Sequence, residues 1–177
     1  MQMREIAGPY RINEVVGRLA GSIDADCAGR PVVLIGVLKG AFIFLSDLAR
    51  RMDTPVEVDF IRAASYGDAC VSSGSVRITK DVETPLGGRD VIIVEDIVDS
   101  GFTLEAIVAH IMAKGPASLK VCALIDKPSG RKVMCSMDYV GMEVGDEFIV
   151  GYGLDHAERY RNLSGLYAIE QDMPEAT

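Results

Sequence analysis

Residues 91–104 read VIIVEDIVDSGFTL, and this stretch decides both the fold class and the place of the functional site. Its first four residues are apolar and branched, which predicts a strand buried on both faces of a parallel sheet. Two carboxylates, Glu95 and Asp96, follow, and a short polar loop leads into a helix predicted over residues 103–114. A strand, a loop and a helix in this order form the unit of an α/β sheet, and such sheets bind ligands at the carboxyl ends of their strands.

The loop after this strand has the composition of a phosphate site. Gly101 allows a tight turn, and the free N–H groups, the helix dipole and the Ser100 and Thr103 hydroxyls predict a cradle for one phosphate. Carboxylates beside an anion site make sense if Glu95 and Asp96 accept hydrogen bonds from ribose hydroxyls of the same molecule. A metal ion bound across these hydroxyls would relieve the remaining repulsion.

Each acidic residue, taken singly, has a plainer interpretation. Glu95 and Asp96 could be solvated loop acids, and Asp99 could cap the helix. The combination of acids, glycine and hydroxyls favours a sugar phosphate site over these alternatives. The segment has the spacing of neither a Walker loop nor a dinucleotide-binding fingerprint.

The rest of the chain continues the alternation of strands and helices. Helices are predicted over residues 10–23, 41–52 and 103–114, and strands over 31–38, 56–63, 76–80, 91–94, 119–125, 148–150 and 167–169. The sequence therefore predicts one α/β domain over residues 1–177, with a mainly parallel twisted sheet flanked by helices.

Composition limits the classes of function. The chain has 177 residues, of which 49% are hydrophobic and 25% charged, as expected for a globular domain with a real core. Its net charge of −8 and its lack of a Lys/Arg cluster argue against nucleic acid as a partner. No apolar stretch is long enough to span a membrane, and the four cysteines show no zinc-site spacing, so we expect a cytoplasmic protein.

The segment VIIVEDIVDSGFTL resembles the phosphoribosyl pyrophosphate motif of type I phosphoribosyltransferases, and the chain is most similar in pattern to bacterial hypoxanthine-guanine phosphoribosyltransferases. The likeness extends through VLIGVLKGAF, VDFIRAASYG, LIDKPSGR and DEFIVGYGLDHAERYRNL. It implies a core over about residues 10–128, a small base-binding hood over about 129–177 with the N-terminus, and a mobile lid loop. It also implies transfer of 5-phosphoribosyl from phosphoribosyl pyrophosphate to N9 of hypoxanthine or guanine, with Mg²⁺ as the cofactor.

The resemblance also implies a role for each matching residue. For the ribose 5-phosphate it implies binding by Glu95, Asp96, Asp99, Ser100, Gly101, Phe102 and Thr103, with Asp99 as the catalytic acceptor of the purine N7 proton. For the pyrophosphate it implies Leu38, Lys39, Gly40 and Arg161, often with a cis peptide between the first two. It places Ser65 and Tyr66 in the lid. It implies that the purine base is bound by Lys127, Phe148, Ile149 and Asp155, and that the metal ion is bound by Glu95, Asp96 and Asp155.

Several of these residues have structural interpretations when considered alone. Lys39 and Lys127 could be solvated lysines, and the segment at Ser65 could be an ordinary hairpin loop. Phe148 and Ile149 could be core residues of a strand, and Asp155 and Arg161 could form surface ion pairs. Two other classes of protein share parts of this pattern. One is a nucleotide-sensing relative that regulates RNA or DNA, and the other is a signalling receiver domain, whose acidic pair should end the first strand. A homodimer or homotetramer is expected by resemblance only.

Overall fold

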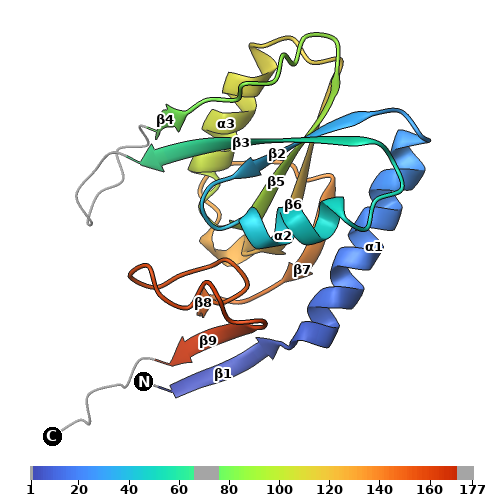
Figure 1. The fold of residues 1–177 in the computed structure, drawn as a ribbon. Coiled ribbons are helices and arrows are strands. Elements are labelled where there is room, and N and C mark those ends of the chain that lie inside the picture. The colour runs from blue at the N-terminus through green and yellow to red at the C-terminus, as the bar shows by residue number, and fades with distance from the viewer. Residues whose placement is uncertain (1, 66–75, 171–177) are drawn as a thin grey trace, which may run out of the picture.

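The computed structural model describes residues 2–65 and 76–170, and a six-stranded sheet forms its centre (Figure 1). The strands lie in the order β4 (Val76–Lys80), β3 (Val56–Ser65), β2 (Val32–Val37), β5 (Asp90–Val98), β6 (Ser118–Asp126) and β7 (Tyr139–Glu143). All neighbours in this sheet are parallel except β3 and β4, which pair antiparallel at one edge. The mainly parallel sheet predicted from the sequence is therefore confirmed.

Helices cover both faces of this sheet. Helices α1 (Pro9–Cys27) and α2 (Phe42–Ala49) pack into one core with Val32 and Leu34 of β2, whereas α3 (Phe102–Met112) packs into the other with Val33 and Ile35. Successive side chains of a strand point to opposite faces, so a strand between two cores must be apolar at every position. Strand β2 is buried at all of its positions, which confirms the interpretation of its continuous apolar run.

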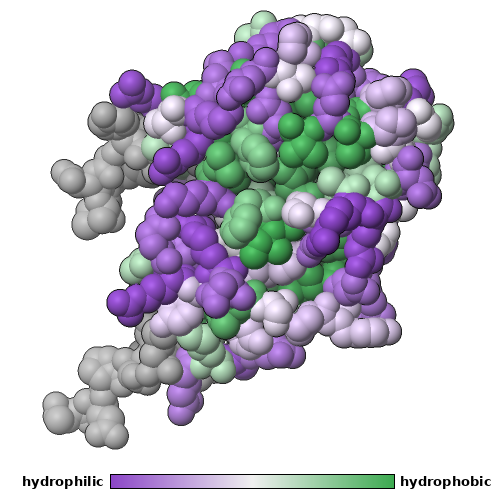
Figure 2. All heavy atoms as spheres, viewed as in Figure 1, coloured by the Kyte–Doolittle hydropathy of each residue, from purple (hydrophilic) through white to green (hydrophobic). Residues whose placement is uncertain are grey.

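Hydrophobic side chains also reach the surface around α2 (Figure 2). Phe42 at the start of α2 and Val58 on β3 are among the exposed large hydrophobic residues. No helix in the described part of the chain is long and apolar enough to cross a membrane.

A second, three-stranded sheet lies below the large one in Figure 1. Its antiparallel strands have the order β1 (Gln2–Ala7), β9 (Leu166–Glu170) and β8 (Phe148–Val150), so the N-terminal strand joins the last segment of the chain. Its strands lie in the ranges where the resemblance implies a hood, residues 129–177 and the N-terminus. Strand β7, although it lies within the range 129–177 assigned to the hood, pairs with β6 in the large sheet.

One expectation about a strand was wrong, and two strands were not predicted. Strand β5 does not end at Val94, because its pairing with β6 continues as far as Val98 opposite Asp126. Glu95 and Asp96 therefore lie inside the strand. Strands β1 and β7 were not predicted, since neither is an unbroken apolar run and each is only partly buried. Their pairing with distant segments stabilises them.

Candidate active site

The carboxyl ends of β2, β5 and β6 bring three polar segments together at one edge of the large sheet. Residues 38–40 follow β2, residues 99–104 follow β5, and Lys127 follows β6. The loop after β8 adds Asp155 and Arg161. A cavity of about 320 Å³ lies between these segments, and a smaller one of about 160 Å³ is lined by side chains within residues 95–104. This is the place where an open parallel sheet binds ligands.

The two adjacent acids of β5 line different cavities. Glu95 is buried and lines the smaller cavity beside Ser100 and Thr103, whereas Asp96 lines the larger cavity together with Asp155. The alternation of side chains along a strand accounts for this separation. The structure thus places both acids at the site but does not direct them to one shared point.

Burial makes both of these carboxylates easier to protonate. The pKa of Glu95 is raised well above its usual range, mainly by burial and further by the negative charge of Asp96. Burial also raises the pKa of Asp96 to about 6, although its own and the Ile97 N–H groups and Arg161 act in the opposite direction. Two charged acids with little water around them are stabilised by hydroxyl donors or by a cation.

The loop after β5 forms a turn that only glycine suits. Gly101 has a φ of +90° and is the N-cap of α3, and a Cβ there would lie 3.0 Å from a Val133 methyl group. The first helical hydrogen bond runs from the Glu105 N–H to the Gly101 carbonyl at 2.9 Å. The preceding amides, including those of Phe102 and Thr103, are therefore not used within the helix. Free amides at a helix N-terminus can bind an anion.

Asp99 and Lys127 stand side by side at the entrance to the larger cavity. The Lys127 Nζ lies 3.6 Å from the Asp99 Oδ2, and the lysine side chain is 11% exposed against 55% for the aspartate. Gly130 packs directly under the aspartate, since a Cβ at this glycine would overlap the Asp99 carboxylate. Asp99 does not cap α3, whose N-cap residue forms no side-chain hydrogen bond.

A cluster of ion pairs covers the other side of the larger cavity. The Arg161 Nη2 lies 2.7 Å from the Asp155 Oδ1 and 3.2 Å from the Glu158 Oε2, and the Lys39 Nζ lies 3.0 Å from the Glu158 Oε1. Hydrogen bonds from Lys39 and Arg161 lower the pKa of Glu158. The peptide bond between Leu38 and Lys39 is cis. Sequence reasoning missed Glu158, whose contact with Lys39 spans 119 positions of the chain.

An apolar wall completes the larger cavity. Phe148 is 49% exposed, whereas its neighbour Ile149 is buried, so the aromatic ring is the available surface of β8. The ring of His156 meets Phe148 edge to face, with centroids 5.2 Å apart. Ile97 and Leu154 also line the cavity and were missed, because isolated apolar residues at strand ends carry no distinguishing sequence signal.

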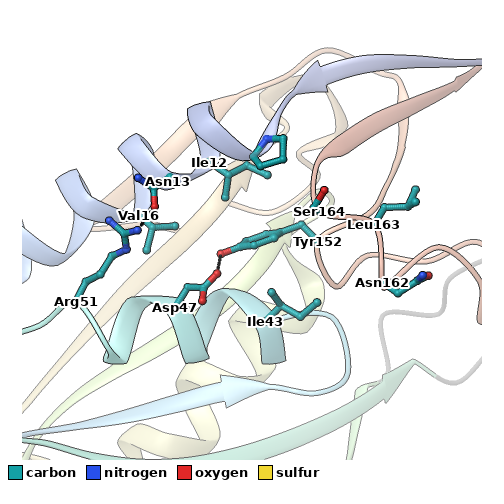
Figure 3. A pocket seen from close by; sticks show the side chains of 11 residues that line it. Ile12, Asn13, Val16, Ile43, Asp47, Arg51, Tyr152, Asn162, Leu163 and Ser164 are labelled. Atoms are coloured by element: carbon teal, nitrogen blue, oxygen red, sulfur yellow. Dashed lines mark hydrogen bonds between the residues drawn. The ribbon is translucent and has the colours of Figure 1, made fainter.

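A third cavity, of about 310 Å³, is lined by side chains of α1 and α2 and by residues 152 and 162–164 of the segment between β8 and β9 (Figure 3). Here the Tyr152 ring reaches between α1 and α2, and its hydroxyl donates a hydrogen bond to the Asp47 Oδ2 at 2.6 Å. Burial and this hydrogen bond both raise the pKa of Tyr152. The tyrosine therefore anchors the loop to the helices of the core.

Some predicted residues are not assembled with the others. Ser65 ends β3, and Tyr66 lies outside the described residues. Within residues 2–65 and 76–170 no group of three His, Cys, Asp or Glu residues is placed to hold a metal ion. Glu95, Asp96 and Asp155 therefore do not form a preformed metal cage, although the last two share the larger cavity.

Comparison with known proteins identifies the family. The model of the phosphoribosyl transferase domain matches residues 9–157, and the chain belongs to this family. It is 48% identical over 152 residues to a hypoxanthine-guanine phosphoribosyltransferase of Bacillus subtilis, covering 86% of this chain and 84% of that protein. It is also 49% identical over 152 residues to the bifunctional protein TilS/HprT of Listeria innocua. That match covers 86% of this chain but only 24% of the length of the Listeria protein.

Solved structures agree with this assignment. A hypoxanthine-guanine phosphoribosyltransferase of Bacillus anthracis superposes with a TM-score of 0.91 at 43% identity, over 94% of this chain and 98% of that one. A hypoxanthine phosphoribosyltransferase of Staphylococcus aureus superposes with the same TM-score at 37% identity, over 94% and 91% of the two chains.

Proposed function

We propose that this chain transfers the 5-phosphoribosyl group of phosphoribosyl pyrophosphate to N9 of a 6-oxopurine, hypoxanthine or guanine. The products are IMP or GMP and pyrophosphate, so the reaction serves purine salvage. One observation carries the proposal: the cavity that contains Asp96, Lys127 and Phe148 adjoins the free amides of the loop after β5. A purine, a ribose and a phosphate follow one another in a nucleotide in the same order.

The base subsite suits the edge of a 6-oxopurine. On that edge the oxygen O6 and the nitrogen N7 are neighbours, and the Lys127 ammonium and the Asp99 carboxylate are neighbours in the cavity. The ammonium would donate to O6, whereas the amino group of adenine would meet a second donor and leave both unpaired. The exposed ring of Phe148 would stack on the purine and contribute about 1–3 kcal/mol.

The chemical step can then be written with its atoms balanced. The N9 lone pair attacks the anomeric carbon, the bond from that carbon to the pyrophosphate oxygen breaks, and the N7 proton passes to the Asp99 carboxylate. A placed proton acceptor accounts for about 10²–10⁴-fold in rate. Fixing base and sugar against each other accounts for roughly 7–11 kcal/mol, so positioning outweighs proton transfer.

Lys39 and Arg161 lie on the far side of the larger cavity, where the pyrophosphate would leave. Both are held in the unliganded protein by Glu158, whose carboxylate stands where an anion would bind. The pyrophosphate would replace this carboxylate as their partner. The leaving group would thus keep two cationic donors as its charge develops.

Magnesium fits the acidic side of the cavity. Asp96 and Asp155 would hold the ion through one or two oxygens, with water and phosphate oxygens completing its shell, which is the usual arrangement for Mg²⁺. When bound, the ion neutralises the pyrophosphate and makes it a better leaving group. The cytoplasmic location and the homodimeric or homotetrameric state remain predictions.

The test is product formation. The protein is incubated with magnesium, phosphoribosyl pyrophosphate and one of hypoxanthine, guanine, xanthine or adenine, and nucleotides are separated by chromatography. We expect IMP and GMP with one pyrophosphate released for each. Absence of nucleotide with every oxopurine, or faster formation of AMP, would contradict the proposal.

A further inference from the structure

The turn after β6 is built against the loop after β5. The Lys127 N–H donates to the Val98 carbonyl at 3.0 Å, and the N–H groups of Lys132 and Val133 donate to the Ser100 carbonyl at 2.9 and 3.2 Å. These contacts lie on both sides of Asp99. The segment KPSGR, whose only assigned member is Lys127, therefore shapes the loop that carries the proposed proton acceptor.

Arg131, at the end of this segment, makes the central contacts. Its Nε donates to the Asp99 carbonyl at 2.9 Å and its Nη2 to the Val98 carbonyl at 3.3 Å, and the same Nη2 pairs with the Asp126 carboxylate. A fourth contact runs from Nη1 to the Cys135 Sγ at 2.8 Å. The side chain is only 18% exposed, so these bonds are poorly accessible to competing water.

The chemistry of these contacts explains why an arginine stands here. The pairing of β5 with β6 ends at Val98 opposite Asp126, so the Asp99 carbonyl lies beyond the sheet pairing and needs another donor. A guanidinium offers five donors in a rigid plane and can reach two carbonyls and a carboxylate together. A lysine ammonium at the end of a flexible stem cannot hold the same arrangement.

Fixing the Asp99 carbonyl also fixes what lies on either side of it. A peptide unit is planar and trans, so the Ser100 N–H must point away from Arg131 once the Asp99 carbonyl points toward it. Because Arg131 binds the Val98 and Asp99 carbonyls together, the peptide units on both sides of the Asp99 Cα are held, and the direction of its Cα–Cβ bond follows. The carboxylate then rests on Gly130, in the same turn.

We propose that Arg131 is a positioning residue, which holds the Asp99 carboxylate in the geometry that phosphoribosyl transfer requires. It acts through the backbone and touches no substrate. The inference rests on the proposed function, because it assigns the purpose of Arg131 to the reaction of Asp99.

A double-mutant cycle tests this inference. Arg131→Lys is measured alone and in the Asp99→Asn background, with IMP formation at saturating substrates as the readout. Misplacing a reacting group by about 1 Å can cost roughly 100-fold, so we expect kcat to fall by about that factor in the first case. With the proton acceptor already removed, the same substitution should cost less than about threefold, since a misplaced carboxylate is then absent.

Arg30→Lys is the matched control. Arg30 also bonds a carboxylate and a carbonyl, those of Asp90 and Asp26, but at the opposite end of the strands, and its substitution should leave kcat unchanged. Asp126→Asn supplies a second variant if Arg131→Lys does not fold, because it keeps the guanidinium and removes the negative charge of one partner. It should lower kcat, again only while Asp99 is present.

The outcomes separate the two claims. If the wild-type protein makes no nucleotide, the proposed function is wrong and the cycle is not reached. If the wild-type protein is active and the loss caused by Arg131→Lys is equal in both backgrounds, Arg131 acts independently of Asp99 and the inference is overturned. A loss no larger than that of Arg30→Lys would overturn it as well.

Discussion

Replacing Asp96 by Asn should stabilise the unliganded protein while it disables substrate binding. Burial raises the pKa of Asp96 from 3.8 to about 6, so the charged carboxylate is less favourable in the folded protein than in the unfolded chain. One pKa unit corresponds to about 1.4 kcal/mol, and the full penalty above pH 6 is therefore about 3 kcal/mol. Partial contact with water reduces this, so we expect a gain of about 1–3 kcal/mol.

The rise in melting temperature expected from Asp96→Asn depends on pH. A carboxylate whose folded-state pKa is raised destabilises the folded protein at high pH, and the penalty disappears as the pH falls toward 3.8. At pH 7.5 Asp96→Asn should raise the melting temperature by about 3–10 °C. At pH 4.5, where the folded protein is already mostly protonated at this position, about a third of that gain should remain.

Scanning calorimetry without ligands measures both values. Asp99→Asn is the matched control, because the Asp99 side chain is 55% exposed and its loss should shift the melting temperature by no more than about 2 °C. Adding magnesium and phosphoribosyl pyrophosphate should raise the melting temperature of the wild type but not of Asp96→Asn. A melting temperature for Asp96→Asn at or below that of the wild type at pH 7.5, or a gain independent of pH, would refute the reasoning.

Three further predictions concern Gly130 beneath the Asp99 carboxylate, the ring of Phe148 and the ion pairs of Asp81. Gly130→Ala should lower kcat by about 10- to 100-fold, because the added Cβ displaces the Asp99 carboxylate. Gly21→Ala in α1 is the control: an added Cβ there meets nothing within 4 Å, so kcat should stay unchanged in the same assay. Phe148→Ala should raise the KM for hypoxanthine by about 10- to 100-fold with little change in melting temperature, since the ring is half exposed; an unchanged KM would exclude stacking. Burial would raise the pKa of Asp81, but hydrogen bonds from the His110 and Lys114 side chains and from a backbone amide lower it to about 2, so its stabilisation is present above pH 3.8 and is lost toward pH 2. Asp81→Asn should therefore lower the free energy of unfolding, measured with urea, by about 1 kcal/mol at pH 6 and by almost nothing at pH 2. The value at pH 6 allows for screening by water, since the Asp81 side chain is 43% exposed. An equal loss at both pH values would contradict this assignment.

The centre of the fold could be predicted because its signals are local. The apolar run of β5, the glycine at 101 and the apolar face of α3 lie within one short stretch, and each indicates the same unit. The extent of β5 could not be predicted, because the pairing of Glu95 with Ala123 and of Ile97 with Ile125 comes from another strand. That extension turns Glu95 and Asp96 to different cavities.

Residues that act through tertiary contacts were the ones missed. Glu158 accepts a hydrogen bond from Lys39, which is far away in the sequence. Arg131 donates hydrogen bonds to the backbone carbonyls of Val98 and Asp99. Backbone carbonyls carry no sequence signal, so an arginine that binds them looks like any surface arginine. Asp99 and Lys127 were found because the resemblance gave each one a role.

The most direct test of the account is a crystal structure of the protein with IMP. We expect the phosphate oxygens within about 3 Å of the amides of residues 101–103, and the purine against Phe148 with its O6 and N7 edge toward Lys127 and Asp99. A nucleotide phosphate bound elsewhere, for example in the cavity beside Arg51, would contradict the account. So would a purine bound outside the cavity that Asp96 lines.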